Sequence, residues 1–318
     1  MAQDTTTVDS KVLLDAIDKA EKNLDANLDG QPLKLDRYNL GPWSFSKAKV
    51  LSQCQYNFYL KYILKIKVPT TTDRTLANVG STAHRILEHV CMGKSVDKAF
   101  QLTKQEFVEK DRLITPALWE ERLVPVELSV SNFADKLDSI HRKFKVKRVL
   151  TEIRFGLTDQ WEPTTFFGDN VWYRGILDLA IQLETPEGAD LLCIDHKTGG
   201  GEFASSTKNY DAQLNSYKVA YHFGIEKLAG AQAGINFIKE GKLIWGDYSD
   251  KEEIEGKLKK TIVWDLDGAV DGVTGNGFFK HVRGNHCQYC DFNDSCRAGH
   301  LKDHEKTTKR RVIPIIQG

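Results

Sequence analysis

Two aspartates and a lysine form the part of the sequence whose residue types could do chemistry. Asp195 and Lys197 close the apolar run in LLCIDHKTGG, and Asp178 lies upstream in RGILDLAIQL. Residues two apart on a strand point to the same face of a sheet, so Asp195 and Lys197 should lie together. Carboxylates that hold a divalent cation, with an amine beside them, can activate water for hydrolysis.

A different interpretation of this stretch is a strand that ends in a solvated turn. If the two strands pair, Asp178 and Asp195 approach each other, and their charges repel unless a cation or a proton lies between them. That repulsion favours a metal site. The run from His196 to Gly200, however, also suits an ordinary turn whose charges face water. Residue types alone leave both interpretations open.

Helices are expected first along the chain, because apolar residues recur there every three to four positions. Cys54 falls near the middle of one of these helices, and Pro125 interrupts the last helical region. The predicted helices cover residues 9–25, 44–66 and 75–92, with two more between 96 and 145.

Strands are expected in the second half of the chain, where apolar and polar residues alternate. Helical spacing returns between the strands, as a connection between parallel strands requires. The predicted strands cover 148–157, 171–183, 189–195, 231–239 and 242–248, and the predicted helices 208–223 and 250–261. This order predicts a mixed α/β core.

Composition limits the kind of protein and the kind of DNA contact. The chain has 318 residues, 41% hydrophobic and 28% charged, which suits one large domain. Its formal net charge is zero, so any contact with a polyanion must come from local patches. No apolar run approaches a membrane span and the start lacks a signal peptide, so we expect a cytoplasmic protein without membrane contact.

Several basic and aromatic segments could supply such local patches. Each also has an ordinary use, because basic runs are mostly solvated faces and aromatic side chains mostly pack in cores. The basic candidates are 141–148, Lys257, Lys259 and Lys260, and 309–311, and the aromatic candidates are Tyr56–Tyr62 and Trp172-Tyr173.

The spacing of the cysteines predicts a metal site. Cys287, Cys290 and Cys296 form C-x2-C-x5-C near the C-terminus, whereas the other three of the six cysteines are scattered. Thiols stay reduced inside cells, so a disulfide framework is not expected there. Clustered thiols at such spacings are typical of metal ligands.

Four motifs in order carry a resemblance to a known family. They are G-x-x-x-H ending at His84, G-x-x-D ending at Asp178, D-x-K-T-G beginning at Asp195, and Q-x-x-x-Y from Gln213 to Tyr217. Together they resemble the RecB-like branch of the PD-(D/E)XK nuclease superfamily over about residues 44–297. The resemblance implies a restriction-endonuclease-like mixed sheet flanked by helices, with a helical N-terminal portion.

The same resemblance implies roles for individual residues. Mg²⁺ or Mn²⁺ would be held by His84, Asp178 and Asp195, with the His196 carbonyl as an extra oxygen. Lys197 would orient or help deprotonate the attacking water, and Gln213 and Tyr217 share a helix face that could reach the site. Glu152 resembles an acidic position found near the site in relatives, although it could equally be an exposed strand residue paired with Arg154.

The cysteines add a second resemblance. Cys54 together with Cys287, Cys290 and Cys296 looks like the ligand set of the iron-sulfur nucleases in this family, which include CRISPR-associated adaptation exonucleases and a component of bacterial helicase-nucleases. This implies a C-terminal cysteine-bound [4Fe–4S] cluster that ties the two ends of the chain together. The alternative is a local Zn²⁺ site made by the three C-terminal cysteines and His300, with Cys54 as a buried apolar residue.

The function implied is metal-dependent DNA hydrolysis, most plausibly exonucleolytic on single-stranded ends. No G-x4-G-K-[S/T] motif occurs, so any helicase would be a partner, and a recombination or CRISPR-type protein is another expected partner. The setting would be a bacterial or phage-infected cell. The alternative is a non-catalytic DNA-binding or assembly factor that keeps the fold.

The expected organisation is one compact domain with four segments. These are an N-terminal helical appendage over 1–35, a helical region with Cys54 and His84 over 36–147, a nuclease core over 148–248, and a C-terminal region with the cluster cysteines over 249–318.

Overall fold

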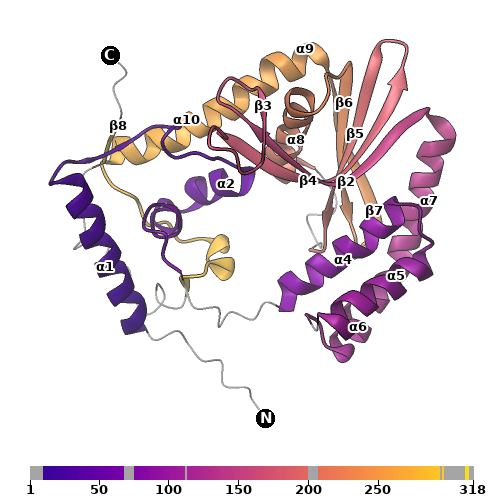
Figure 1. Cartoon of the computed structure of the whole chain (residues 1–318), viewed down its shortest axis with the longest axis horizontal. Helices are drawn as coiled ribbons and strands as arrows, with labels where there is room; N and C mark the ends of the chain where they lie inside the picture. The colour runs from indigo at the N-terminus through magenta and orange to yellow at the C-terminus, as the bar shows by residue number, and fades with distance from the viewer. Residues whose placement is uncertain are drawn as a thin grey trace. The chain divides into compact units, whose positions relative to one another are not determined.

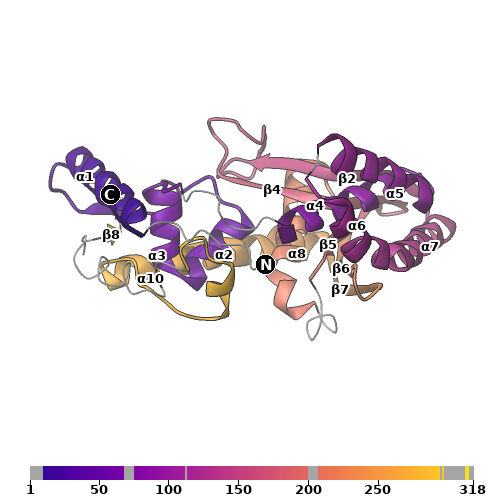
Figure 2. The same cartoon turned by 90° about the horizontal axis from the view of Figure 1, so that it is seen from below.

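The computed structural model describes residues 10–67, 75–111, 113–199, 207–293, 296 and 312–314 (Figures 1 and 2). The chain divides into two compact units, one made of both chain ends, Met1–Asp73 with Val263–Gly318, and one made of Arg74–Ile262. The four segments expected from the sequence remain a prediction. No helix among the described residues is long and apolar enough to cross a membrane.

The Arg74–Ile262 unit is built on a six-stranded sheet with the order β3-β2-β4-β5-β6-β7. β5 and β6 are parallel, and every other neighbouring pair is antiparallel. The strands are β2 (Val146–Leu157), β3 (Pro163–Thr164), β4 (Tyr173–Thr185), β5 (Gly188–Lys197), β6 (Gly230–Phe237) and β7 (Lys242–Asp250). The prediction of a mixed α/β fold is confirmed.

Helices cover both faces of this sheet (Figure 1). Ile181 and Leu183 of β4 pack in one apolar cluster with the helices α4 to α7. Gln182, which points the other way because strand side chains alternate, accepts a hydrogen bond from Tyr221 of α8 at 3.3 Å. The helices are α4 (Thr75–Cys91), α5 (Val96–Lys104), α6 (Pro116–Arg122), α7 (Glu127–Lys143) and α8 (Asp211–Gly224).

The region between 96 and 145 contains more helices than the two predicted. Ser95 caps the start of α5 through a hydrogen bond from the Lys98 amide. Thr115 caps α6 in the same way, and Pro116 occupies the first turn of that helix, where its missing amide costs nothing. Thr115-Pro116 therefore starts a helix that the apolar rhythm alone did not reveal.

The unit made of both chain ends is mainly helical. Two short strands, β1 (Leu33–Leu35) and β8 (Val312–Pro314), pair in parallel within it. Its helices are α1 (Ser10–Leu28), α2 (Phe45–Gln53), α3 (Gln55–Phe58), a π-helical turn over Tyr59–Ile63, and the C-terminal part of α10 (Lys259–Asn276), which follows α9 (Lys251–Glu253) and a π-helical turn over Ile254–Leu258.

The prediction that Cys54 lies within a continuous helix over 44–66 is wrong. Cys54 has an extended backbone (φ −154°, ψ 101°) and separates α2 from α3. Hydrogen bonds to a distant segment hold this break, because the Tyr56 amide donates to the Lys280 carbonyl and the Lys280 amide donates to Gln55 Oε1. Tertiary contacts thus outweigh the helical rhythm and free Cys54 to face a pocket.

Candidate functional site

Three carboxylates lie in one row across the centre of the sheet. The hydrogen-bonded pairs on either side place Glu152 of β2 opposite Asp178 of β4. The ladder between β4 and β5 likewise places Asp178 opposite Asp195. Like charges directly opposite one another destabilise a sheet, so this row costs folding free energy unless something compensates it.

Glu152 also has an unusual backbone. Its φ of +49° lies in the left-handed region, which a non-glycine residue within a strand seldom adopts. Such conformations cost about 1–3 kcal/mol and persist where the surrounding structure enforces them. The strain accompanies an exposed carboxylate aimed at the row, and together they indicate a functional position.

His84 of α4 completes the group. Its Nδ1 lies 3.6 Å from Asp178 Oδ2 and 3.9 Å from Glu152 Oε1, and its Nε2 lies 3.0 Å from the His196 carbonyl oxygen. A carbonyl only accepts, so Nε2 donates in this contact and Nδ1 faces two carboxylates. Burial lowers the pKa of His84, but the hydrogen bond to Glu152 and the charge of Asp178 outweigh it and raise the pKa.

Asp178 holds its proton unusually strongly. Burial and the charge of Asp195 raise the pKa of Asp178 to about 7, although the His196 amide donates to Asp178 Oδ2 at 2.7 Å. A carboxyl with such a pKa exchanges its proton readily for a cation near neutral pH.

Asp195 is held by α8 and by Lys197. Its Oδ1 accepts hydrogen bonds from Gln213 Nε2 at 2.9 Å and from the Tyr217 hydroxyl at 3.0 Å. Its Oδ2 lies 2.6 Å from Lys197 Nζ, which also donates to Gln213 Oε1 at 3.3 Å. Burial and the charge of Asp195 raise the pKa of Tyr217 well above its usual value, so its hydroxyl stays a donor.

These residues fit a hard divalent cation. His84, Glu152 and Asp178 offer ligand atoms that all lie within 4.8 Å of one another. Asp195 Oδ2 is buried and, within the described part of the chain, receives no well-aligned hydrogen bond beyond its ion pair with Lys197. Carboxylate and carbonyl oxygens are the ligands that Mg²⁺ and Mn²⁺ prefer.

The predicted backbone ligand lies beside this group. The His196 carbonyl accepts the hydrogen bond from His84 Nε2 at 3.0 Å, which leaves Nδ1 of His84 toward Asp178 and Glu152. A carbonyl oxygen has a second lone pair, so this bond still leaves it able to face an ion. Burial lowers the pKa of the His196 ring well below its usual value, so this side chain stays neutral beside Phe133. Its backbone faces the site and its ring packs in the core.

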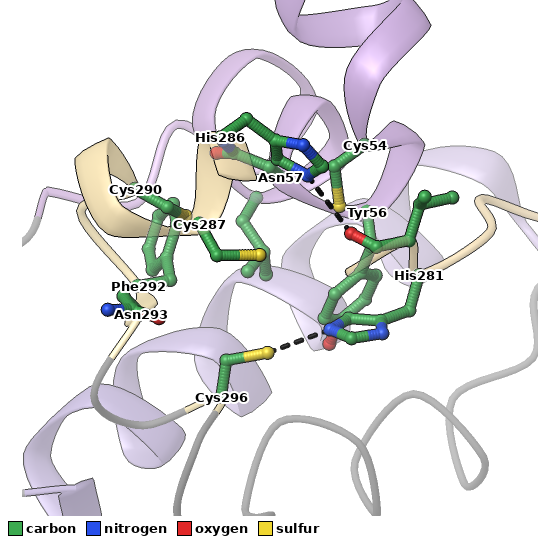
Figure 3. A pocket seen from close by; sticks show the side chains of 12 residues that line it. Cys54, Tyr56, Asn57, His281, His286, Cys287, Cys290, Phe292, Asn293 and Cys296 are labelled. Atoms are coloured by element: carbon green, nitrogen blue, oxygen red, sulfur yellow. Dashed lines mark hydrogen bonds between the residues drawn. The ribbon is translucent and has the colours of Figure 1, made fainter. Parts of the chain in front are cut away.

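Four cysteines line one pocket in the unit made of both chain ends (Figure 3). Cys54 comes from the break before α3, and Cys287, Cys290 and Cys296 come from the short 3₁₀ helix Asn285–Tyr289 and the segment after it. Figure 3 shows the sulfurs of Cys54, Cys287 and Cys296 directed into the same space. All four are free thiols.

The electrostatics of this pocket favour the binding of a positively charged group. Burial raises the pKa of Cys290 to about 11, and the charges of Cys54 and Cys296 add to the effect. Burial also raises the pKa of Cys296, against which Arg283 acts. Each of these thiols makes it harder for the others to ionise. A cationic centre that binds all of them as thiolates would remove this repulsion.

A histidine that the motif search missed also lies in the pocket. His281 Nε2 is 2.7 Å from Cys296 Sγ. No cysteine spacing includes this residue, and only the fold of the segment before Cys287 brings it there. His300, the histidine of the zinc alternative, lies outside the described residues.

The scattered cysteines and most predicted DNA-contact segments contain residues that pack in the interior or form ion pairs within the protein. Burial raises the pKa values of Cys91 and Cys193 to about 12. Lys145 pairs with Glu184, while Lys147 and Arg148 both pair with Glu226. Tyr56, Tyr59, Trp172 and Tyr173 are buried, whereas residues 309–311 lie outside the described part of the chain.

A family model and one relative agree with the nuclease resemblance. The family model of the PD-(D/E)XK nuclease superfamily matches residues 42–297. One component of an ATP-dependent helicase/deoxyribonuclease from Clostridium botulinum is 24% identical over 291 residues, covering 78% of this chain. This chain spans only 24% of that relative's length. The crystal structure of SSO0001 matches over 92% of this chain and 97% of its own, with 10% identity and a TM-score of 0.33.

Proposed function

Because the chain belongs to the PD-(D/E)XK nuclease superfamily, we propose that it is a metal-dependent deoxyribonuclease that hydrolyses phosphodiester bonds. One observation supports this more than any other: Lys197 Nζ lies 2.6 Å from Asp195 Oδ2, beside the cluster of His84, Glu152 and Asp178. A lysine held against a buried acid beside candidate metal ligands suits the activation of water, which a protein that only binds DNA does not perform.

In this proposal His84, Asp178 and Asp195 hold Mg²⁺ or Mn²⁺, with the His196 carbonyl and Glu152 as further ligands. When bound, such a cation offsets the charge that develops on the phosphate and lowers the pKa of water. The chain's own acids position the cation, and the buried face of α8 limits the access of bulk water to Asp195, whose side chain is 3% exposed.

Lys197 acts on the attacking water. Its side chain is 27% exposed, so it can reach solvent while Asp195 and Gln213 fix the position of its amine. A cation held there stabilises a developing hydroxide and the phosphate charge. Gln213 and Tyr217 are positioning residues, because they bind Asp195 Oδ1 and leave Oδ2 for the reaction side.

We assign the activity to single-stranded DNA ends, in partnership with a helicase. The exonuclease assignment extends the resemblance of the motifs. The helicase partner is supported by the name of the clostridial relative, of which this chain spans about a quarter. Recombination or CRISPR-type partners fit the same role, and the cytoplasm of a bacterial or phage-infected cell is the setting proposed.

We also assign a [4Fe–4S] cluster to Cys54, Cys287, Cys290 and Cys296. The zinc alternative uses the three C-terminal cysteines with His300 and leaves Cys54 as an apolar residue of the core. Cys54 instead lines the same pocket as Cys287, Cys290 and Cys296. Four thiols around one pocket match the usual ligand count of a [4Fe–4S] cluster, and this supports iron-sulfur over zinc.

A cleavage assay tests the nuclease proposal. End-labelled single-stranded and double-stranded DNA are incubated with Mg²⁺ or Mn²⁺ and with wild type or Lys197→Ala. We expect wild type to release short products and the variant to be at least about 100-fold slower, the usual effect of losing a positioned proton-transfer group. Cleavage by the variant at the wild-type rate contradicts the role of Lys197. Absence of cleavage by both proteins favours a non-catalytic DNA-binding factor.

A further inference from the structure

Two phenylalanines and two arginines form a patch at the β2–β4 end of the sheet. Phe167 is 75% exposed, and Arg154 is also exposed. The Arg174 guanidinium lies 5.0 Å from the centre of the Phe166 ring and 5.6 Å from that of Phe167, and Arg154 lies 5.9 Å from Phe166. We name these four residues, Arg154, Phe166, Phe167 and Arg174, the Arg-Phe patch.

The loop that carries the patch is held in place. Arg174 Nη1 donates a hydrogen bond to the Phe166 carbonyl at 3.1 Å. The residues that flank this segment in sequence are packed, because Trp161 and Trp172 contact each other edge to face with ring centres 5.6 Å apart and each is 6% exposed. Phe167, by contrast, presents a large aromatic ring to solvent, where it adds little to the core.

The arginines of the patch lack the partners that other arginines of this unit have. Arg85 pairs with Glu88 and Glu106, and Arg148 pairs with Glu226. Neither Arg154 nor Arg174 forms an ion pair with a carboxylate within the described part of the chain. Their charge is available to an anion, and the rings beside them are available to a flat group.

The patch lies along the strands that carry the acidic row. Arg174 precedes Asp178 by four residues on β4, which at about 3.3 Å per residue is roughly 13 Å. Ile176, 39% exposed, lies between them and pairs with Arg154 of β2. This distance corresponds to a few nucleotides of a DNA strand.

We propose that the Arg-Phe patch binds single-stranded DNA, with an unpaired base stacked on Phe167 and phosphates on Arg154 and Arg174. Stacking is independent of sequence because every base has a flat face, and a duplex hides those faces in its own stack. The inference rests on the proposed nuclease function, for which the patch positions the strand ahead of the acidic row.

Binding without cleavage tests the patch. The affinity for a fluorescent single-stranded oligonucleotide is measured in EDTA for wild type, Phe167→Leu and Phe167→Trp. We expect leucine to weaken binding roughly ten-fold and tryptophan to keep it, because only an aromatic ring stacks on a base. Trp264→Leu is the matched control, since Trp264 is 68% exposed and lies outside the patch and outside the candidate DNA-contact segments. Equal affinity for wild type and Phe167→Leu overturns the proposal.

Two further measurements distinguish base stacking from non-specific hydrophobic binding. In a series of oligonucleotides, a single abasic site is placed at successive positions. At one position it should weaken binding by wild type, and at that position it should not change binding by Phe167→Leu. Arg154→Gln should lower the slope of log affinity against log salt by about 0.7, the value for one phosphate of a single strand. An unchanged slope together with no abasic effect contradicts the assignment.

Failure of the patch and failure of the nuclease function give different results. If wild type cleaves DNA, and Phe167→Leu binds and cleaves equally well, the patch is wrong and the nuclease function stands. If no protein cleaves but binding depends on Phe167, the patch stands as a DNA-binding surface and the nuclease function is wrong.

Discussion

At the scale of single residues, the proton on Asp178 would compete with the proposed metal ion. Burial and the charge of Asp195 raise the pKa of Asp178 to about 7, and His84 facing it also has a raised pKa. A cation must displace these protons to bind. Metal affinity and proton affinity are therefore two measures of the same arrangement of charges.

We predict that Mn²⁺ affinity falls steeply below pH 7. Because a proton must leave Asp178, the dissociation constant should rise by about five-fold from pH 7 to pH 6, with a further rise from the proton on His84, and change little from pH 8 to pH 9. Calorimetric titration with Mn²⁺ measures this. Asp190→Asn, on the same sheet, should leave the profile unchanged, and a profile flat from pH 6 to pH 9 contradicts the role of Asp178.

The same shift predicts how stability depends on pH. A carboxyl whose pKa is raised by folding favours the folded state while it is protonated, and this contribution is lost as pH rises through about 7. Asp178→Asn should therefore stabilise the metal-free protein at pH 8 relative to wild type. The gain should shrink as the pH falls toward the usual range of an aspartate, which thermal unfolding in EDTA can follow. A gain that grows at low pH is the contrary result.

At the scale of elements, β2 carries backbone strain at the proposed metal site. Glu152 lies opposite Asp178 with a φ of +49°, so both its charge and its backbone oppose folding. α8 acts in the other direction, because Gln213 and Tyr217 satisfy one oxygen of Asp195 and fix its orientation. β2 thus holds a strained residue at the site, whereas α8 restricts the orientation of the Asp195 side chain.

We predict that Glu152→Asn stabilises the fold and weakens metal binding. Asparagine adopts left-handed backbone conformations more readily than glutamate, and the change removes a charge beside Asp178. The free energy of unfolding in EDTA should rise by on the order of 1 kcal/mol. Glu152→Gln removes only the charge and is the matched control. If Glu152→Asn is no more stable than Glu152→Gln, backbone strain at this position does not measurably lower the free energy of unfolding.

Local sequence patterns predicted the strands and helices whose conformation follows from the periodicity of neighbouring residues. The alternation over 171–183 and 189–195 anticipated β4 and β5, and the rhythm over 208–223 anticipated α8. The motif residues on them were placed correctly on strand or helix, and the structure brings them within hydrogen-bonding range. Their chemical roles remain predictions.

Features fixed by distant contacts were not predictable. The break at Cys54 depends on Lys280, more than 200 positions away in the chain. His281 lies beside Cys296 because of the same packing, and β1 pairs with β8 from the opposite chain end. The left-handed backbone of Glu152 lies between two regular ladder pairs, Thr151 with Leu179 and Ile153 with Leu177. None of these has a signature in a local window.

At the scale of the whole chain, both sequence ends belong to one unit and contribute cysteines to one pocket. Met1–Asp73 and Val263–Gly318 form a compact body around helices, two short strands and the cysteine pocket. A cluster held by Cys54 and by the C-terminal cysteines would close a loop of more than 200 residues. Closing so long a loop restricts the unfolded chain and so stabilises the folded one.

We predict that Cys54→Ser removes iron and loosens this unit. Anaerobically purified wild type should contain iron and acid-labile sulfide, and the variant should lose most of both, because one of four thiolate ligands is missing. Loss of the cross-link should lower the melting temperature by roughly 10 °C and expose the chain-end segments to protease. Cys91→Ser is the matched control, since Cys91 lies on α4, outside the pocket. Zinc without iron, at a level that Cys54→Ser leaves unchanged, contradicts the cluster, because a zinc site built from the C-terminal cysteines alone has no need of a ligand from the other end of the chain.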